Sequence, residues 1–124
     1  MATQTLTAAT FEDTVTGNAM VLVDFWASWC APCRMFAPVF EKASQKHAGI
    51  VFGKVDTQAE PALSNAAQIT SIPTLMVFRD GILVFKQPGA LRPADLDRLI
   101  EAVKALDMSE VRTQLAAQQG AAVR

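Results

Sequence analysis

Several residue types are scarce in this 124-residue sequence, and each scarcity argues against a class of protein. It contains no tyrosine, one histidine and two cysteines, too few for a disulfide-stapled scaffold or for a four-ligand zinc site within one chain. No apolar run reaches the roughly 18 residues of a membrane-spanning helix. The formal net charge of −1 offers no basic surface for nucleic acid. We therefore expect no metal, no nucleic-acid partner and no membrane partner.

The sequence does have enough apolar residues for one well-packed domain. They make up 51% of the chain, which supports a hydrophobic core without disulfide staples. The first residues lack the basic start and apolar block of a signal peptide. We therefore expect a cytoplasmic protein, and we expect it to be a monomer. In the reducing cytoplasm an isolated pair of cysteines is more often catalytic than structural.

Both cysteines lie in one short motif, Trp29-Cys30-Ala31-Pro32-Cys33. It follows an apolar run that reads as a buried strand and precedes a long helical pattern. The unpaired N–H groups of a first helical turn stabilise an anion, so they favour the reactive thiolate at Cys30. Pro32 suits that first turn. Cys33 follows one turn later on the same face, within reach of a disulfide.

This Cys-x-x-Cys motif has three possible interpretations. A zinc site lacks ligands, because His47 is the only histidine. A purely structural disulfide would close a very short loop and remove little entropy from the unfolded chain. The strand before the motif and the helix after it favour a reversible redox pair.

The hydrophobic pattern predicts an α/β fold with a central mixed sheet. A parallel β-α-β half precedes a linking helix and a β-β-α half, which places helices on both faces of the sheet. Asp80-Gly81 between two apolar runs predicts a hairpin. We expect four helices: a short one that begins at residue 10, one from the cysteines to about residue 48, one over residues 61–67, and one from residue 93 to about 106. The expected strands span residues 20–27, 50–56, 74–78 and 82–85.

The chain divides into a domain over residues 1–106 and a C-terminal extension over 107–124. Asp107 and the residues after it could cap one more short helix. Apolar positions then become sparse, and residues 118–122 are expected to fray. We therefore predict a loosely attached helix with a disordered end.

Asp24 lies inside the apolar strand that leads to the cysteines. An unpaired buried carboxylate is costly, so burial should raise the pKa of Asp24 until it can hold a proton near neutral pH. It could be a structural acid paired with Lys54 or a proton relay for the cysteines, and we favour the relay.

Two further residues have expected positions. Trp29 is expected to be partly exposed beside the motif, whereas His47 is expected to be a solvated residue at a helix end.

A larger set of motifs identifies a family resemblance. In order and spacing, residues 6–106 resemble the thioredoxin family, which the Cys-x-x-Cys motif alone would not establish. Two features depart from the family pattern: Ala31 replaces the usual glycine, and the chain continues past the usual C-terminus. The matching segments are Val23-Asp24-Phe25-Trp26-Ala27, Trp29-Cys30-Ala31-Pro32-Cys33, Arg34-Met35 with Pro38, Lys54-Val55-Asp56, Ile72-Pro73-Thr74, Phe78-Arg79-Asp80-Gly81 and Gly89-Ala90.

The resemblance implies a thioredoxin fold and a protein-disulfide reductase. Cys30 corresponds to the attacking cysteine and Cys33 to the resolving one. Asp24 corresponds to the buried acid that helps deprotonate Cys33, and Lys54 to the lysine that tunes this acid.

The resemblance also implies a surface for protein substrates with disulfides. Pro73 corresponds to a cis-proline opposite the disulfide. This bond would leave the Ile72 backbone available to an extended substrate segment. The remaining members of this surface are Trp29, Gly89 and Ala90.

Electrons must come from another protein, because the sequence has no glycine-rich dinucleotide motif. The resemblance implies NADPH as the source, through a thioredoxin reductase, with no bound cofactor. Ala31 and Pro32 would tune the redox potential, and the uncharged Pro32 favours a reductant over a disulfide isomerase. The alternative is a non-enzymatic module that uses the same surface for binding or assembly.

Overall fold

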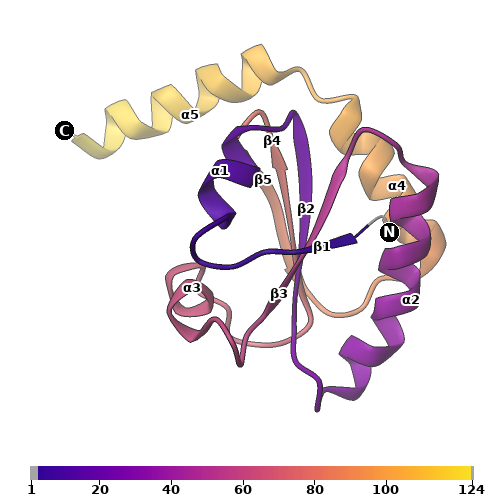
Figure 1. Cartoon of the computed structure of the whole chain (residues 1–124). Coiled ribbons are helices and arrows are strands. Elements are labelled where there is room, and N and C mark those ends of the chain that lie inside the picture. The colour runs from indigo at the N-terminus through magenta and orange to yellow at the C-terminus, as the bar shows by residue number, and fades with distance from the viewer. Residues whose placement is uncertain (1–2, 124) are drawn as a thin grey trace.

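The computed structural model describes residues 3–123, which fold around one mixed β-sheet (Figure 1). Within these residues the strands follow the spatial order β1-β3-β2-β4-β5. The elements are β1 (Thr3–Thr5), α1 (Phe11–Thr16), β2 (Met20–Trp26), α2 (Ala31–Lys46), β3 (Val51–Asp56), α3 (Pro61–Ala66), β4 (Thr74–Arg79), β5 (Ile82–Pro88), α4 (Pro93–Lys104) and α5 (Met108–Val123).

Strand β2 occupies the centre of the sheet. It pairs in parallel with β3 and antiparallel with β4. A strand covered on both faces needs apolar residues on both, which explains why β2 is a nearly continuous hydrophobic run rather than an alternating one. Six of its seven residues are buried, and the cysteine motif follows directly from its end.

Helices cover both faces of the sheet, as predicted. Figure 1 shows α2 and α4 together on one side and α1 and α3 on the other. Because side chains alternate along a strand, Leu22 packs with α2 and α4, whereas Val23 and Phe25 pack on the opposite side. Asp24, two residues after Leu22, therefore belongs to the face that α2 covers.

Strand β1 is the main element that the sequence did not predict. It is three residues long and largely exposed, so it carries no apolar pattern. It pairs in parallel with β3, and the following Leu6 is buried. Gly53 provides the space for Leu6, because a Cβ at Gly53 would lie 2.4 Å from Leu6 Cδ1.

The predicted hairpin between β4 and β5 is confirmed. Asp80 and Gly81 have φ angles of 53° and 78°, the left-handed values that two-residue hairpin turns require. Strand β5 extends to Pro88, three residues beyond the predicted end.

At α1, Thr10 occupies the N-cap position without capping the helix. Its hydroxyl oxygen instead accepts a hydrogen bond from the Thr7 N–H.

Helices α2 and α4 are joined where α2 ends. His47 Nε2 lies 3.1 Å from Asp97 Oδ1, and the His47 side chain is nearly buried. The expectation of a solvated histidine is therefore wrong. Lys46 also binds Asp97, and the two contacts together lower the pKa of that carboxyl group.

The C-terminal helix α5 continues to Val123, so residues 118–122 are helical where fraying was expected. Asp107 Oδ1 accepts hydrogen bonds from the backbone N–H groups of Ser109 and Glu110, which is the predicted cap. Among the described residues, no helix combines the length and the apolar character needed to cross a bilayer.

Candidate active site

Cys30 occupies the N-cap position of α2. Its sulfur accepts a hydrogen bond from the backbone N–H of Cys33 at 3.2 Å. This N–H is one of those that a helix leaves without an internal partner. The fold thus directs a helix N-terminus at the Cys30 sulfur, as the spacing of strand, motif and helix predicts.

The two cysteines form a disulfide with a Cα–Cα distance of 5.2 Å. Both residues are buried, but only Cys30 lines the groove at this end of the sheet. A partner in the groove could therefore reach Cys30 directly, whereas Cys33 lies behind it in the first turn of α2.

Asp24 is fully buried beneath this helix, with 0% of its surface exposed. Within residues 3–123 neither of its carboxyl oxygens has a hydrogen-bond partner. Burial raises the pKa of Asp24 from 3.8 to about 7, and the nearby Lys54 partly opposes this rise. The carboxyl group can therefore gain or lose a proton near neutral pH, as the sequence predicts.

Lys54 lies beside Asp24 on the neighbouring strand, in direct register. Its ammonium group sits 5.0 Å from the centre of the Trp26 ring, close enough for a cation–π interaction. It forms no ion pair with Asp24 among the described residues. The structure therefore provides no ion pair to support the interpretation of Asp24 as a structural acid paired with Lys54.

The segments carrying Pro73 and Gly89 meet next to the disulfide. The Ile72–Pro73 peptide bond is cis, as the resemblance implied. The Ile72 carbonyl oxygen lies 3.6 Å from Cys30 Sγ. The Gly89 N–H donates to the Pro73 carbonyl oxygen at 2.8 Å, which brings Gly89 and the exposed Ala90 to the same region.

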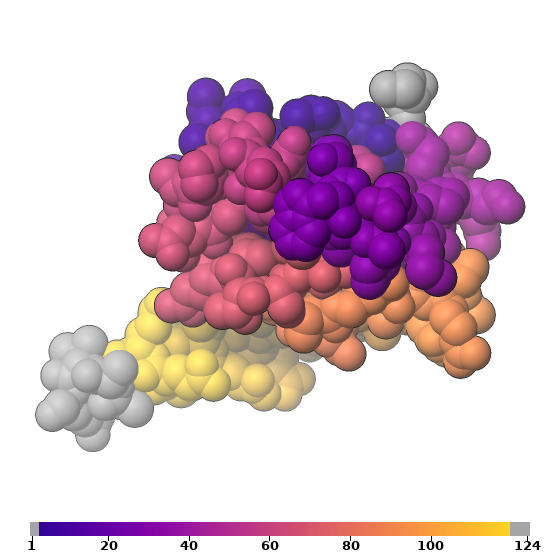
Figure 2. Space-filling view, turned by 90° about the horizontal axis from the view of Figure 1, so that it is seen from below, coloured from indigo at the N-terminus to yellow at the C-terminus, as the bar shows by residue number. Residues whose placement is uncertain are grey.

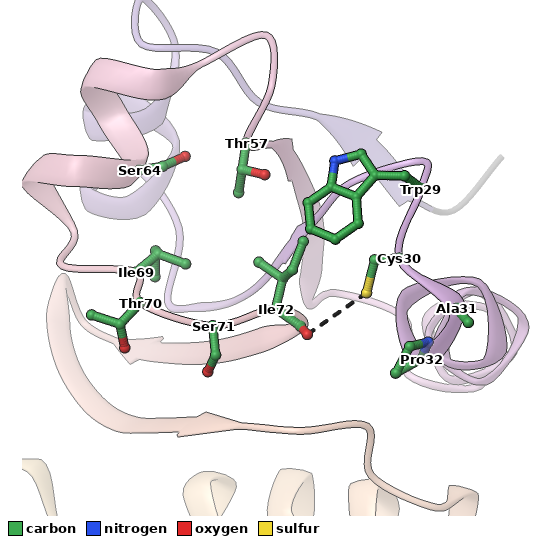
Figure 3. A pocket seen from close by; sticks show the side chains of 10 residues that line it. All are labelled: Trp29, Cys30, Ala31, Pro32, Thr57, Ser64, Ile69, Thr70, Ser71 and Ile72. Carbon is green, nitrogen blue, oxygen red and sulfur yellow. Dashed lines mark hydrogen bonds between the residues drawn. The ribbon is translucent and has the colours of Figure 1, made fainter.

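A groove of about 500 Å³ opens beside Cys30. In Figure 3 the Trp29 indole ring stands at one wall, and Ile72 faces Cys30 across the gap. Trp29 is 64% exposed, as expected for an aromatic contact surface. Figure 2 looks onto this end of the molecule, where the purple segment after β2 adjoins the pink segment around α3.

The opposite wall of the groove was not predicted. It consists of the α3 residue Ser64 and of residues in loops, Thr57 and the run from Ile69 to Ser71. These positions carry no motif of their own; only the adjoining Ile72-Pro73 could have indicated them.

The sequence also did not predict that Arg34 supports the loop before the cysteines. Its guanidinium group donates to the Ser28 carbonyl oxygen at 2.9 Å, which ties α2 to that loop.

Comparison with known proteins identifies the family. The family model "Thioredoxin" matches residues 2–104. The chain belongs to the thioredoxin family. A Streptomyces coelicolor relative named as a thioredoxin is 53% identical over 117 residues, which cover 94% of this chain and 87% of that protein.

Solved thioredoxins share the fold. A thioredoxin of Halobacterium salinarum superposes with a TM-score of 0.77 at 32% identity, covering 84% of this chain and 91% of that one. A Mycobacterium leprae protein named bifunctional thioredoxin reductase/thioredoxin is 41% identical over 92 residues, which cover 73% of this chain and 20% of that protein.

As a thioredoxin, the chain is a thiol–disulfide oxidoreductase that reduces protein disulfides. Its redox-active centre is the Cys30–Cys33 pair. The part of the chain that the structure describes contains no cluster of three or more metal-binding side chains.

Proposed function

We propose that Cys30 attacks target disulfides, that Cys33 releases the product with help from Asp24, and that an NADPH-dependent thioredoxin reductase restores the dithiol. The main support is the position of Cys30, whose sulfur lies between the N-terminus of α2 and an open groove. Exposed Trp29 and the segments at Ile72-Pro73 and Gly89-Ala90 would hold the target.

In the first step, the Cys30 thiolate attacks one sulfur of the target disulfide. The Cys30–target bond forms while the target S–S bond breaks, and the other target sulfur leaves as a thiolate that takes up a proton. The helix N-terminus stabilises the attacking thiolate in the reduced protein.

In the second step, Cys33 attacks Cys30. The Asp24 carboxylate accepts the Cys33 thiol proton, the Cys30–Cys33 bond forms, and the second target sulfur leaves as a thiolate. The target gains two electrons and the pair loses two. A pKa of about 7 suits this role, because Asp24 can take up and return a proton near neutral pH.

Regeneration needs two electrons from outside the chain. The Mycobacterium leprae relative carries both names, thioredoxin reductase and thioredoxin, which supports such a donor for this chain. A dithiol that must remain reduced between cycles also fits a cytoplasmic location.

Insulin reduction by the protein, supplied with NADPH and a thioredoxin reductase, tests this function. We expect turbidity from the released insulin chains and matching NADPH oxidation, because each cycle consumes two electrons. The Cys30→Ser/Cys33→Ser variant should be inactive. If this variant instead retained full biological function in cells, the chain would act as a binding module.

Replacing Asp24 by asparagine tests the second step. Asp24→Asn should slow release of the reduced target roughly a hundredfold, the lower range for loss of a general base. Single-turnover kinetics should show a persistent mixed disulfide on Cys30. Asp13→Asn, an exposed acid on α1, is the matched control, and equal release rates in the two variants would rule out the relay.

A further inference from the structure

The loop between α3 and β4, residues 67–73, forms one wall of the groove beside Cys30. Its residues 69–72 all line that groove, and the Ile72 carbonyl oxygen lies 3.6 Å from Cys30 Sγ. Figure 3 shows this run leading from the end of α3 to the Cys30 sulfur. The position of the α3–β4 loop therefore sets the space that a target finds next to the reactive cysteine.

Few backbone hydrogen bonds fix the middle of the α3–β4 loop. Within residues 3–123, the N–H groups of Thr70, Ser71 and Ile72 donate to no backbone carbonyl oxygen. The loop is held at its ends instead. At the end next to β4, the Thr74 hydroxyl group donates to the Ser71 carbonyl oxygen at 2.6 Å. The position of the wall then depends on how firmly the other end, next to α3, is held.

Helix α3 ends in a left-handed residue, Gln68, whose φ angle is 58°. The Gln68 N–H donates to the Asn65 carbonyl oxygen at 2.9 Å. The next N–H, that of Ile69, donates to the Ser64 carbonyl oxygen at 3.0 Å. These two bonds form a Schellman motif, in which glycine is usual because a side chain makes the left-handed conformation costly. A helix end with glutamine at this position gains from a stabilising contact outside the helix.

Lys86 of the edge strand β5 makes that contact. It lies directly opposite Met76 of β4, whose side chain packs on the face of the sheet that α1 and α3 cover, and residues opposite each other on paired strands share a face. The Lys86 ammonium group donates to the carbonyl oxygens of Ala67 and Gln68 at 2.8 and 3.0 Å. Carbonyl groups at a helix end lack partners within the helix, and a cation there also complements the helix dipole.

We propose that Lys86 is a positioning residue for the target groove: its ammonium group fixes the end of α3 and, through it, the loop that forms the groove wall. This inference rests on the proposed function, in which a target lies in that groove. Lys86 is not one of the residues that line the groove, so it acts through the loop and not on the sulfurs. Its effect should therefore be confined to protein and peptide targets, which are long enough to lie along the wall.

The test is Lys86→Met, which keeps the apolar stem and removes both hydrogen bonds. With NADPH and saturating thioredoxin reductase, the KM for insulin should rise about threefold to tenfold, the range for loss of one hydrogen bond, while kcat stays unchanged. Reduction of bis(2-hydroxyethyl) disulfide, which is too small to extend along the wall, should keep its rate and thereby report correct folding. Amide hydrogen exchange at Ile69 should accelerate, because the end of the loop is released.

Two further variants serve as controls. Lys86→Arg should restore the KM for insulin, because a guanidinium group can also donate to both carbonyl oxygens. Lys104→Met, which removes an exposed lysine paired with Glu101 on α4, should behave like the unmodified protein. An unchanged KM in Lys86→Met, or equal losses toward insulin and the small disulfide, would overturn the proposal. An unmodified protein that reduced neither disulfide would instead refute the proposed function, and this inference with it.

Discussion

At the scale of single residues, the buried Asp24 carboxyl group makes the stability of the fold depend on pH. It is fully buried without a hydrogen-bond partner among the described residues, so its protonated form is the one that the folded protein favours. The pKa of the Asp24 carboxyl group is about 7 in the folded protein, compared with the ordinary value of 3.8 that applies to the unfolded chain. Between these values the folded state binds more protons than the unfolded state, and stability falls as the pH rises.

This linkage predicts a pH-dependent loss of stability. From about pH 5.5 to about pH 8.5 the oxidised protein should lose about 2 kcal/mol of unfolding free energy as Asp24 ionises. Asp24→Asn should remove this loss, because asparagine carries no ionisable proton in that range. Urea unfolding at both pH values measures the difference. The Asp13→Asn control should keep the loss, and an equally steep Asp24→Asn profile would contradict the assignment.

At the scale of elements, the last turn of α4 is closed by a residue from the sheet. Arg79, at the end of β4, donates from Nη1 to the carbonyl oxygens of Val103 and Lys104 at 2.8 and 3.1 Å. Carbonyl groups in a final helical turn have no partner within the helix, and a cation there also complements the helix dipole. This contact joins the end of β4 to the last turn of α4.

Arg79→Met should therefore cost about 1–2 kcal/mol, because it keeps the apolar stem and removes the charged donor. Urea unfolding at constant pH provides the measurement. The control is Arg98→Met on the same helix, whose solvent-exposed ion pair with Asp95 should contribute little to stability. Equal losses in both variants would show that Arg79 acts only as another surface charge.

At the scale of the whole molecule, the redox potential measures how strongly the fold prefers its disulfide over its dithiol. No cation stands between the two cysteines, where Ala31 and Pro32 lie. A cation there would stabilise the thiolate and hence the reduced form, which makes a protein more oxidising. The uncharged motif therefore suits a reductant.

A glutathione redox titration should accordingly give a potential near −270 mV, the value typical of thioredoxins. Pro32→His should raise the potential by about 30 mV or more, because an imidazolium group would stabilise the Cys30 thiolate. Gln45→His, exposed near the far end of α2, should leave it unchanged. A potential near −180 mV, typical of a disulfide isomerase, would contradict the assignment as a reductant.

The sequence by itself determined the parts of this protein that depend on local order. A continuous apolar strand, a cysteine motif and a helix in succession place Cys30 at a helix N-terminus. A lone acid in that strand has to be buried, and Asp80-Gly81 favours the left-handed turn that forms the hairpin. The family resemblance added the cis bond at Pro73, which its local sequence alone leaves open.

Only the tertiary structure decided the contacts between segments distant in the chain. The Lys54 ammonium group lies over Trp26, Gly53 accommodates Leu6, and α5 borders the start of β5. None of these follows from periodicity, because each depends on which strands become neighbours and which face a side chain then shares. The order of strands in the sheet sets those distances, and it arises only when the whole chain packs around β2.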